Sequence, residues 1–110
     1  MVFGLIWALL LPMLIAASPR IAVVNDMRGT SIEEVYLSSV GEEGWGENLV
    51  EGLVVTSGSW FETEVEPGLY RLRAIDGKDR KHEVSLALVL SDYTWRISVE
   101  EPRSYSMPTG

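Results

Sequence analysis

Side chains that could catalyse a reaction are scarce in this chain. The only histidine is His82 and there is no cysteine, so a Ser-His-Asp or Cys-His catalyst would depend on this single imidazole. No serine nucleophile motif accompanies it. A pair of glycosidase carboxylates would need a cleft, for which so small a domain has little depth. We therefore expect His82 at the rim of the core, bonded to backbone or to Asp76, and predict that the protein is not an enzyme.

Acidic side chains are the remaining candidates for a metal site. Zinc sites use several His or Cys ligands, which this chain lacks. Asp76 and Asp79 of the stretch DGKD lie three positions apart without the other ligands of a calcium loop, which favours a hairpin turn. Four glutamates could bind a hard cation weakly, although a solvated acidic face is the favoured interpretation. These are Glu42, Glu43, Glu47 and Glu51. No metal and no cofactor is predicted.

The same glutamates surround Trp45, which lies between two glycines in the stretch SSVGEEGWGENLVEG at residues 38–52. Such a tryptophan could be a binding platform, or it could fold back and close the open end of the core. A buried indole removes about 150–250 Å² from water, which a small core needs, so the second interpretation is favoured. We predict a mostly buried Trp45 over the end of the fold, its N–H bonded to a carbonyl or loop side chain, and Asn48 capping a short turn.

Trp60 is the better candidate for binding, because alternation places it on an outward face with Glu62 and Glu64. An exposed Trp60 close to Tyr36 would form an apolar contact surface. The predicted binding surface joins the aromatic side chains to the acidic loop, and its members are Trp60, Tyr36, Trp45, Glu42, Glu43 and Glu47.

The first 18 residues, MVFGLIWALLLPMLIAAS, carry no charged side chain and are mostly apolar. This pattern is typical of a signal peptide and predicts cleavage after Ala17, with residues 1–17 removed. No Lys or Arg precedes the apolar run and Arg20 follows it, so an uncleaved membrane anchor at residues 1–18 is the alternative. We expect a periplasmic or secreted protein with one domain at residues 18–102 and a flexible tail at residues 103–110.

All charged residues follow the apolar segment, and the formal net charge is −7. Phosphate binding needs a basic surface, so nucleic acid is not an expected partner. Membrane contact is expected only through the N-terminal segment, if it is uncleaved. The sequence therefore favours a binding module with a protein or peptide partner. The alternative is a structural or accessory component of an envelope assembly, held by the N-terminal anchor.

Short runs of alternating polarity predict an all-β fold, in which Glu47–Glu51 is the one candidate for a single helical turn. Strands are expected at Ile21–Asn25, Ile32–Ser38 and Leu53–Val55, and then at 59–65, 69–75, 81–90 and 93–100. Short strands separated by regular turn signals predict a small antiparallel β-sandwich of about seven strands.

Register arithmetic further predicts that the last four strands form a meander. Opposed residues in a hairpin share a face, and three successive hairpins give one consistent inner face. The predicted pairs are Glu64–Arg71, Glu62–Arg73, Leu72–Val84, Tyr70–Leu86, Arg73–Glu83 and Leu88–Trp95. Leu86 would be buried in this arrangement. A hairpin of 20–25 with 32–38 would pack over the meander as the second sheet.

Several of these motifs resemble small exported bacterial β-sandwich proteins. The resemblance rests on WGENL at Trp45–Leu49, on Gly58 before a strand, and on PGLYRLRAIDGKD at Pro67–Asp79. In that group an Asn ends the first strand, a Trp-Gly-x-Asn/Asp-Leu loop follows, and a Gly-x-Tyr-x-Leu-Arg-x-x-Asp strand comes later. The matching positions are Asn25, Ile32, Trp45, Gly46, Asn48, Leu49, Gly68, Tyr70, Leu72, Arg73, Asp76 and Gly77. The resemblance implies this fold and export, and it implies no activity.

Overall fold

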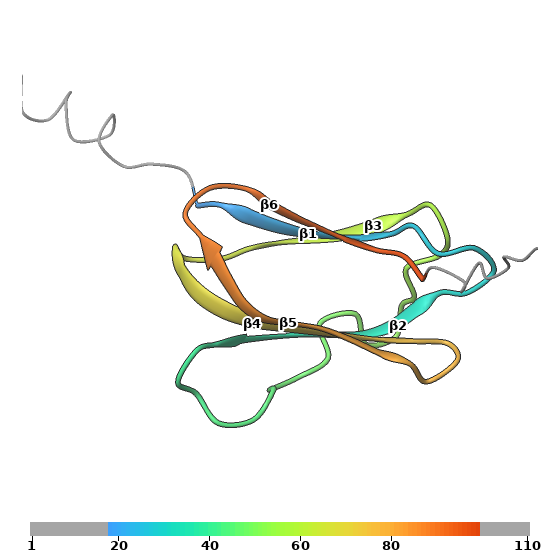
Figure 1. The fold of residues 1–110 in the computed structure, drawn as a ribbon, viewed down its shortest axis with the longest axis horizontal. Coiled ribbons are helices and arrows are strands. Elements are labelled where there is room, and N and C mark those ends of the chain that lie inside the picture. Colours follow the sequence, from blue (N-terminus) through green and yellow to red (C-terminus); the bar gives the residue numbers. More distant parts are fainter. Residues whose placement is uncertain (1–17, 100–110) are drawn as a thin grey trace, which may run out of the picture.

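A computed structural model shows two β-sheets packed face to face (Figure 1). The structure describes residues 18–99, so the predicted signal peptide at 1–17 and tail at 103–110 lie outside the described residues. Six strands occur in this part of the chain: β1 Arg20–Asn25, β2 Ile32–Ser39, β3 Trp60–Glu64, β4 Gly68–Asp76, β5 Lys81–Val89 and β6 Tyr93–Ile97. Between residues 18 and 99 there is no helix, and hence none that could span a membrane.

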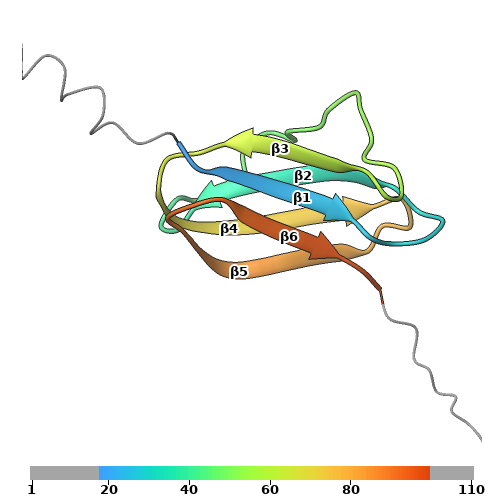
Figure 2. The same ribbon diagram turned by 90° about the horizontal axis from the view of Figure 1, so that it is seen from above.

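The strands divide equally between the two sheets. One sheet has the order β3-β1-β6 and the other the order β2-β4-β5. β1 pairs antiparallel with β3 and parallel with β6, whereas all pairs of the other sheet are antiparallel. Figure 2 shows the first sheet lying over the second, with the strands of both lying along roughly the same direction. The prediction of an all-β fold in two sheets is confirmed. The expected strand at Leu53–Val55 is reduced to a single bridge between Val55 and Ile32.

The predicted four-stranded meander is wrong. Of its three hairpins only β4–β5 exists, because the connections after β3 and after β5 cross to the opposite sheet. β1 lies between β3 and β6, so the predicted pairing of 20–25 with 32–38 is also absent. Alternation identifies which side chains point inward, but a short connection can join two strands of one sheet or two strands of different sheets. The inward residues are therefore compatible with the predicted meander and with the observed pair of sheets.

The predicted Glu62–Arg73 and Glu64–Arg71 pairs are lost with the meander. The two glutamates of β3 instead lie beside β1, each with a carboxylate oxygen 3.6 Å from the guanidinium of Arg20. Arg73 pairs with Glu83 across the one true hairpin, with an Nη2–Oε2 distance of 2.6 Å. That ion pair was correctly predicted.

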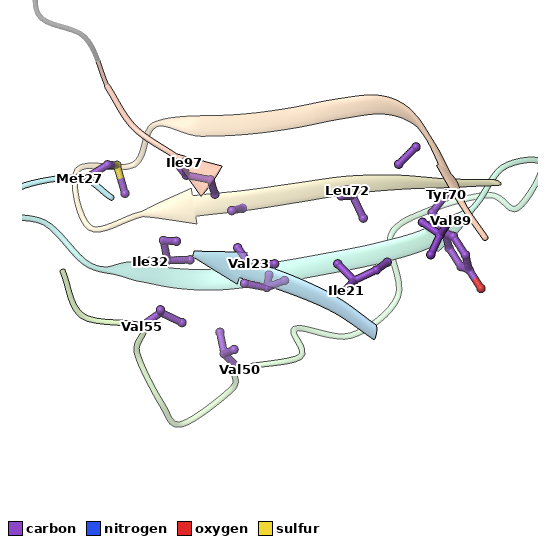
Figure 3. Close-up of a cluster of buried hydrophobic side chains, with 13 residues drawn as sticks. Ile21, Val23, Met27, Ile32, Val50, Val55, Tyr70, Leu72, Val89 and Ile97 are labelled. Carbon is purple, nitrogen blue, oxygen red and sulfur yellow. The ribbon is translucent and has the colours of Figure 1, made fainter. Parts of the chain in front are cut away.

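The core lies between the sheets and contains side chains from five of the six strands together with loop residues (Figure 3). Ile21 and Val23 of β1 and Leu72 of β4 are almost fully buried. Asn25, at the end of β1, is a buried polar residue whose side chain hydrogen-bonds to three backbone groups. Its Nδ2 donates to the carbonyls of Thr30 and Val55, and its Oδ1 accepts from the N–H of Met27. These bonds hold the connection to β2 against the core.

The β4–β5 register shifts by one residue partway along the hairpin. Leu72 faces Val84 as predicted, but Tyr70 faces Ala87 instead of Leu86. Because successive side chains of a strand point to opposite faces, an extra residue in one strand exchanges the inner and outer sets beyond it. Ala87 and Val89 are consequently buried, whereas Leu86, predicted to be inside, is 61% exposed.

Candidate binding surface

Trp45 lies on the outer face of the β2-β4-β5 sheet. Register sets Tyr36 opposite Arg73 and Ser38 opposite Arg71, on the face away from the core. The guanidinium carbons of Arg71 and Arg73 lie 4.5 and 4.6 Å from the centroid of the Trp45 ring. The Tyr36 ring is tilted against the same indole, with centroids 6.5 Å apart. Trp45 is thus held by two cation–π contacts and one aromatic contact.

Arg71 also fixes the backbone of the loop. Its Nη2 donates to Ser38 Oγ at 3.0 Å and to the carbonyls of Glu42 and Gly44 at 3.2 and 3.0 Å. Gly44 and Gly46 have φ of 77° and 76°, a conformation that only glycine adopts without strain. Figure 1 shows the loop after β2 on the side of its sheet away from the core.

The predicted position of Trp45 over the end of the sandwich is therefore wrong. The ring is half-buried on an outer face, and its N–H makes no hydrogen bond to any described residue. Two arginines on alternate positions of β4 offer the indole a polar platform that the open end of the core does not. The acidic neighbours Glu42, Glu43 and Glu47 are exposed, in agreement with a solvated loop surface.

Asn48 caps a turn, as predicted, and also attaches the loop to β2. Its Oδ1 accepts from the N–H of Val50 at 3.1 Å and from that of Val35 at 2.9 Å. The N–H of Leu49 donates to the Val35 carbonyl at 2.8 Å. These bonds occupy backbone groups along the outer edge of β2.

Trp60 is exposed but lies far from Tyr36 in the fold. It begins β3, faces Val24 across the β1–β3 pair and is 61% exposed. Its indole Nε1 donates to Glu62 Oε2 at 3.2 Å. Trp60 and Tyr36 project from the outer faces of different sheets, so the predicted surface combining Trp60 with Tyr36 and Trp45 does not form.

Tyr36 is itself engaged within its sheet. Its hydroxyl donates to a carboxylate oxygen of Glu34, and this hydrogen bond raises the pKa of the Tyr36 phenol above its ordinary value.

His82 is bonded to Asp76, as predicted. The distance from Nε2 to Asp76 Oδ2 is 2.9 Å. The buried carboxylate also accepts from the N–H groups of Lys78 and Arg80 and from Arg80 Nε, at 2.8 to 3.0 Å. Burial alone would raise the pKa of Asp76, but the hydrogen bonds from His82, Arg80 and Lys78 outweigh it and hold this pKa well below its usual range. The cluster closes the β4–β5 turn.

His82 and Ser98 line the same shallow hollow of about 230 Å³, but within residues 18–99 no hydrogen bond joins a serine hydroxyl to the imidazole. Nor do residues 18–99 contain a group of three or more His, Asp or Glu side chains placed to hold a metal ion.

One further feature of the surface is apolar. Leu86, Leu88 and Leu90 are 61%, 59% and 67% exposed, and Leu69, opposite Leu88, is exposed as well. These four residues are called the leucine face below. Leu69, Leu86 and Leu88 lie on the outer side of the β4–β5 hairpin, at the end of the sheet away from the Asp76 turn, and Leu90 directly follows β5. Sequence reasoning found the alternation but assigned it to the core, because the register shift leaves no mark in the polarity pattern.

Comparisons of the chain with protein-family models, with curated proteins and with solved structures found no match. The chemistry of its own surface is therefore the only guide to its function. Of the surfaces described, the leucine face is the one whose side chains have no partner within residues 18–99 that would account for their type.

Replacing Trp45 with alanine should lower the free energy of unfolding by about 1–3 kcal/mol, because it removes two cation–π contacts and part of a buried indole. That is less than a fully buried tryptophan would cost. Trp60→Ala is the matched control, and it should change stability by no more than about 0.5 kcal/mol, because Trp60 is largely exposed. Urea denaturation of the two variants beside the parent provides the comparison. Equal losses of stability in the two variants would show that Trp45 does not pack on Arg71 and Arg73.

Proposed function

We propose that the protein is an exported, non-catalytic binding module whose contact surface is the leucine face. The observation that supports it most strongly is the exposure of Leu86 and Leu88 on β5 and of Leu90 directly after this strand, in a chain with a formal net charge of −7. Contiguous exposed apolar residues on a small domain indicate an interaction site. Its partner is a protein surface of matching apolar character.

The energy available from this surface is sufficient for specific binding. Full burial of a leucine side chain is worth about 1.5–3 kcal/mol relative to exposure. Four leucines that are already partly covered would together supply several kcal/mol, about what the apolar centre of a transient interface contributes. The surrounding charges would form the polar rim.

The aromatic candidates are less suitable as contact surfaces. Trp45 is occupied by Arg71 and Arg73, so a ligand would have to displace contacts that the fold already makes. Trp60 is exposed but is flanked along β3 by Glu62 and forms no cluster with another exposed aromatic ring between residues 18 and 99. The acidic loop contributes solubility.

Export rests on the composition of the N-terminal segment, which is apolar and uncharged through Ser18. In this proposal residues 1–17 are a signal peptide, and the domain from residue 18 onward acts in the periplasm or outside the cell.

A second candidate function is an accessory component of an envelope assembly, held by an uncleaved N-terminal anchor. It is favoured by the position of the chain where it enters the domain. Ser18 and Pro19 line one shallow hollow of about 370 Å³ together with Leu90. An anchor would thus leave the leucine face beside the membrane. The intact mass of the protein from the producing cell separates the candidates, because a chain beginning at Ser18 has no anchor.

Photo-crosslinking in intact producing cells tests the proposed function. The full chain carries the photoreactive residue p-benzoylphenylalanine in place of Leu86, or in place of Leu53 as the matched control. Leu53 is 69% exposed but lies in the loop before Val55, away from the leucine face. We expect one discrete adduct from position 86 and none from position 53. Adding Leu88→Glu should abolish the adduct at 86, since a buried unpaired carboxylate is costly.

Two results would overturn the proposal. The first is the absence of any adduct from position 86 in cells that contain the folded protein. The second is the same set of adducts from both positions, which would mean that the leucine face is no more engaged than an ordinary exposed loop.

A further inference from the structure

We propose that a second copy of this chain pairs antiparallel along the open edge of β5, with Leu88 at the twofold axis, so that the leucine faces of the two copies lie side by side. This inference rests on the proposed function, because the pairing brings leucines of the two copies into lateral contact. A symmetric dimer uses the same patch on both copies, which requires a self-complementary surface. The outer edge of β5 provides one.

The outer edge of β5 is open. The strand has one hydrogen-bonded neighbour, β4, and no backbone group from 84 to 90 bonds to a loop among the described residues. The edge of β2, in contrast, is covered by bonds to Leu49 and Val55. An open, apolar strand edge is a template for pairing with another chain, and proteins usually block it with charge, proline or a covering segment. Residues 84–90 include no charged residue and no proline, and no loop among the described residues bonds to their backbone, so the only irregularity there is the register shift between Val84 and Ala87.

Charge also selects this edge. Two molecules of net charge −7 repel each other, so close contact is least costly where both surfaces are neutral. The run VSLALVLS at 84–91 has no charged residue. The nearest acids along the chain are already engaged within the fold. Glu83 is paired with Arg73, and Asp92 accepts the N–H of Arg20 at 3.0 Å.

The other open edges are less suitable. β3 and β6 have five residues each, and both carry charged side chains. Glu62 and Glu64 alternate along β3, and Arg96 lies in β6, with its guanidinium 3.1 Å from Asp26. A second copy placed on β3 would bring like charges together.

The face alternation fixes the register. Centring the pair on Leu88 sets Leu88 opposite itself and Ala87 opposite Val89, and it brings Leu86 opposite Leu90, the residue directly after β5. The leucines of both copies then form one continuous outer face, and the small inner residues extend the inner layer. The irregular segment between Val84 and Ala87 stays at the end of the paired stretch. Centring on Ala87 would instead force this irregular segment into the ladder.

Because the chain has no cysteine, a disulfide between two copies of a single-cysteine variant can form only at the introduced residue. Opposed residues of an antiparallel pair have Cα atoms about 4.5–5.5 Å apart, within the range of about 4.4–6.8 Å that a disulfide bridges. The full chain carrying Leu88→Cys is expressed with its N-terminal segment, oxidised mildly in the isolated cell fraction and run on a non-reducing gel. Leu53→Cys is the control, because Leu53 is 69% exposed, against 59% for Leu88, and lies outside the leucine face.

We expect Leu88→Cys to give at least about tenfold more disulfide-linked dimer than Leu53→Cys, because pre-paired thiols react at a high effective concentration. Leu86→Cys alone should cross-link poorly, whereas a mixture of Leu86→Cys and Leu90→Cys chains should give the mixed dimer. Equal yields from positions 88 and 53 would overturn the dimer, as would a monomeric Leu88→Cys chain whose circular dichroism matches that of the parent.

Failure of this inference is distinguishable from failure of the proposed function. If the photo-adduct from position 86 has twice the mass of the chain, the binding module and the dimer are both supported. If the adduct contains a different protein, the binding module stands and the dimer is overturned. If position 86 gives no adduct, both are overturned.

Discussion

Replacing Asp76 with alanine should lower the free energy of unfolding by about 3–5 kcal/mol, the usual cost of removing one partner from a buried ion pair. The carboxylate is inaccessible to solvent and accepts from two backbone N–H groups, from Arg80 and from His82. Its removal leaves these donors without a protein acceptor and frees the turn between β4 and β5. Urea denaturation at neutral pH measures the loss.

The same carboxylate predicts the response to acid. The pKa of Asp76 in the folded protein is lowered, so the folded state binds fewer protons than the unfolded state, in which an aspartate titrates near pH ~3.9. Its stabilising contribution is complete above that pH and declines as the pH falls below it. The parent and Asp76→Ala should therefore become more alike in stability below about pH 4.

Glu43→Ala is the control for both measurements, because Glu43 is exposed on the acidic loop and forms no ion pair with a described residue. It should leave stability within about 0.5 kcal/mol of the parent. If Asp76→Ala proved equally mild, the hydrogen bonds at the β4–β5 turn would not hold the hairpin.

Replacing Leu72 with alanine should cost about 2–5 kcal/mol, the range for a large-to-small change in a packed core. Leu72 is 2% exposed and lies between the sheets at the centre of β4. Leu86→Ala makes the same chemical change on the neighbouring strand, yet it should cost less than about 0.5 kcal/mol, because Leu86 points outward.

Thermal or urea denaturation of the two leucine variants compares these positions directly. A loss at Leu86 as large as that at Leu72 would place Leu86 inside the sandwich and remove the leucine face. Comparable small losses at both sites would mean that Leu72 is not packed as described.

Local features of the fold could be predicted from the sequence because they depend on neighbouring residues. The alternation of β4 identified Leu72 as an inward residue, and the polar turn after Asp76 identified the β4–β5 hairpin. The bond between His82 and Asp76 followed from their positions at either side of that turn. Asn48 was recognisable as a cap from its place before Leu49.

Features that depend on distant residues could not be predicted in the same way. The inward pattern of β3 is the same whether it pairs with β4 or with β1, and only the packing of the whole chain decides between them. The position of Trp45 depends on two arginines more than twenty residues further along the chain. Alternation gave no sign of the extra residue between Val84 and Ala87, so the predicted binding surface omitted every leucine of the leucine face.

The leucine face exists only because the β4–β5 register shifts by one residue between Leu72 and Tyr70. Interstrand backbone nuclear Overhauser effects in the folded protein measure this register directly. Tyr70 should show them to Ala87, while Leu72 shows them to Val84. If Tyr70 instead shows them to Leu86, the alternate leucines of β5 point into the core, and neither the binding surface nor the leucine contacts of the dimer can form.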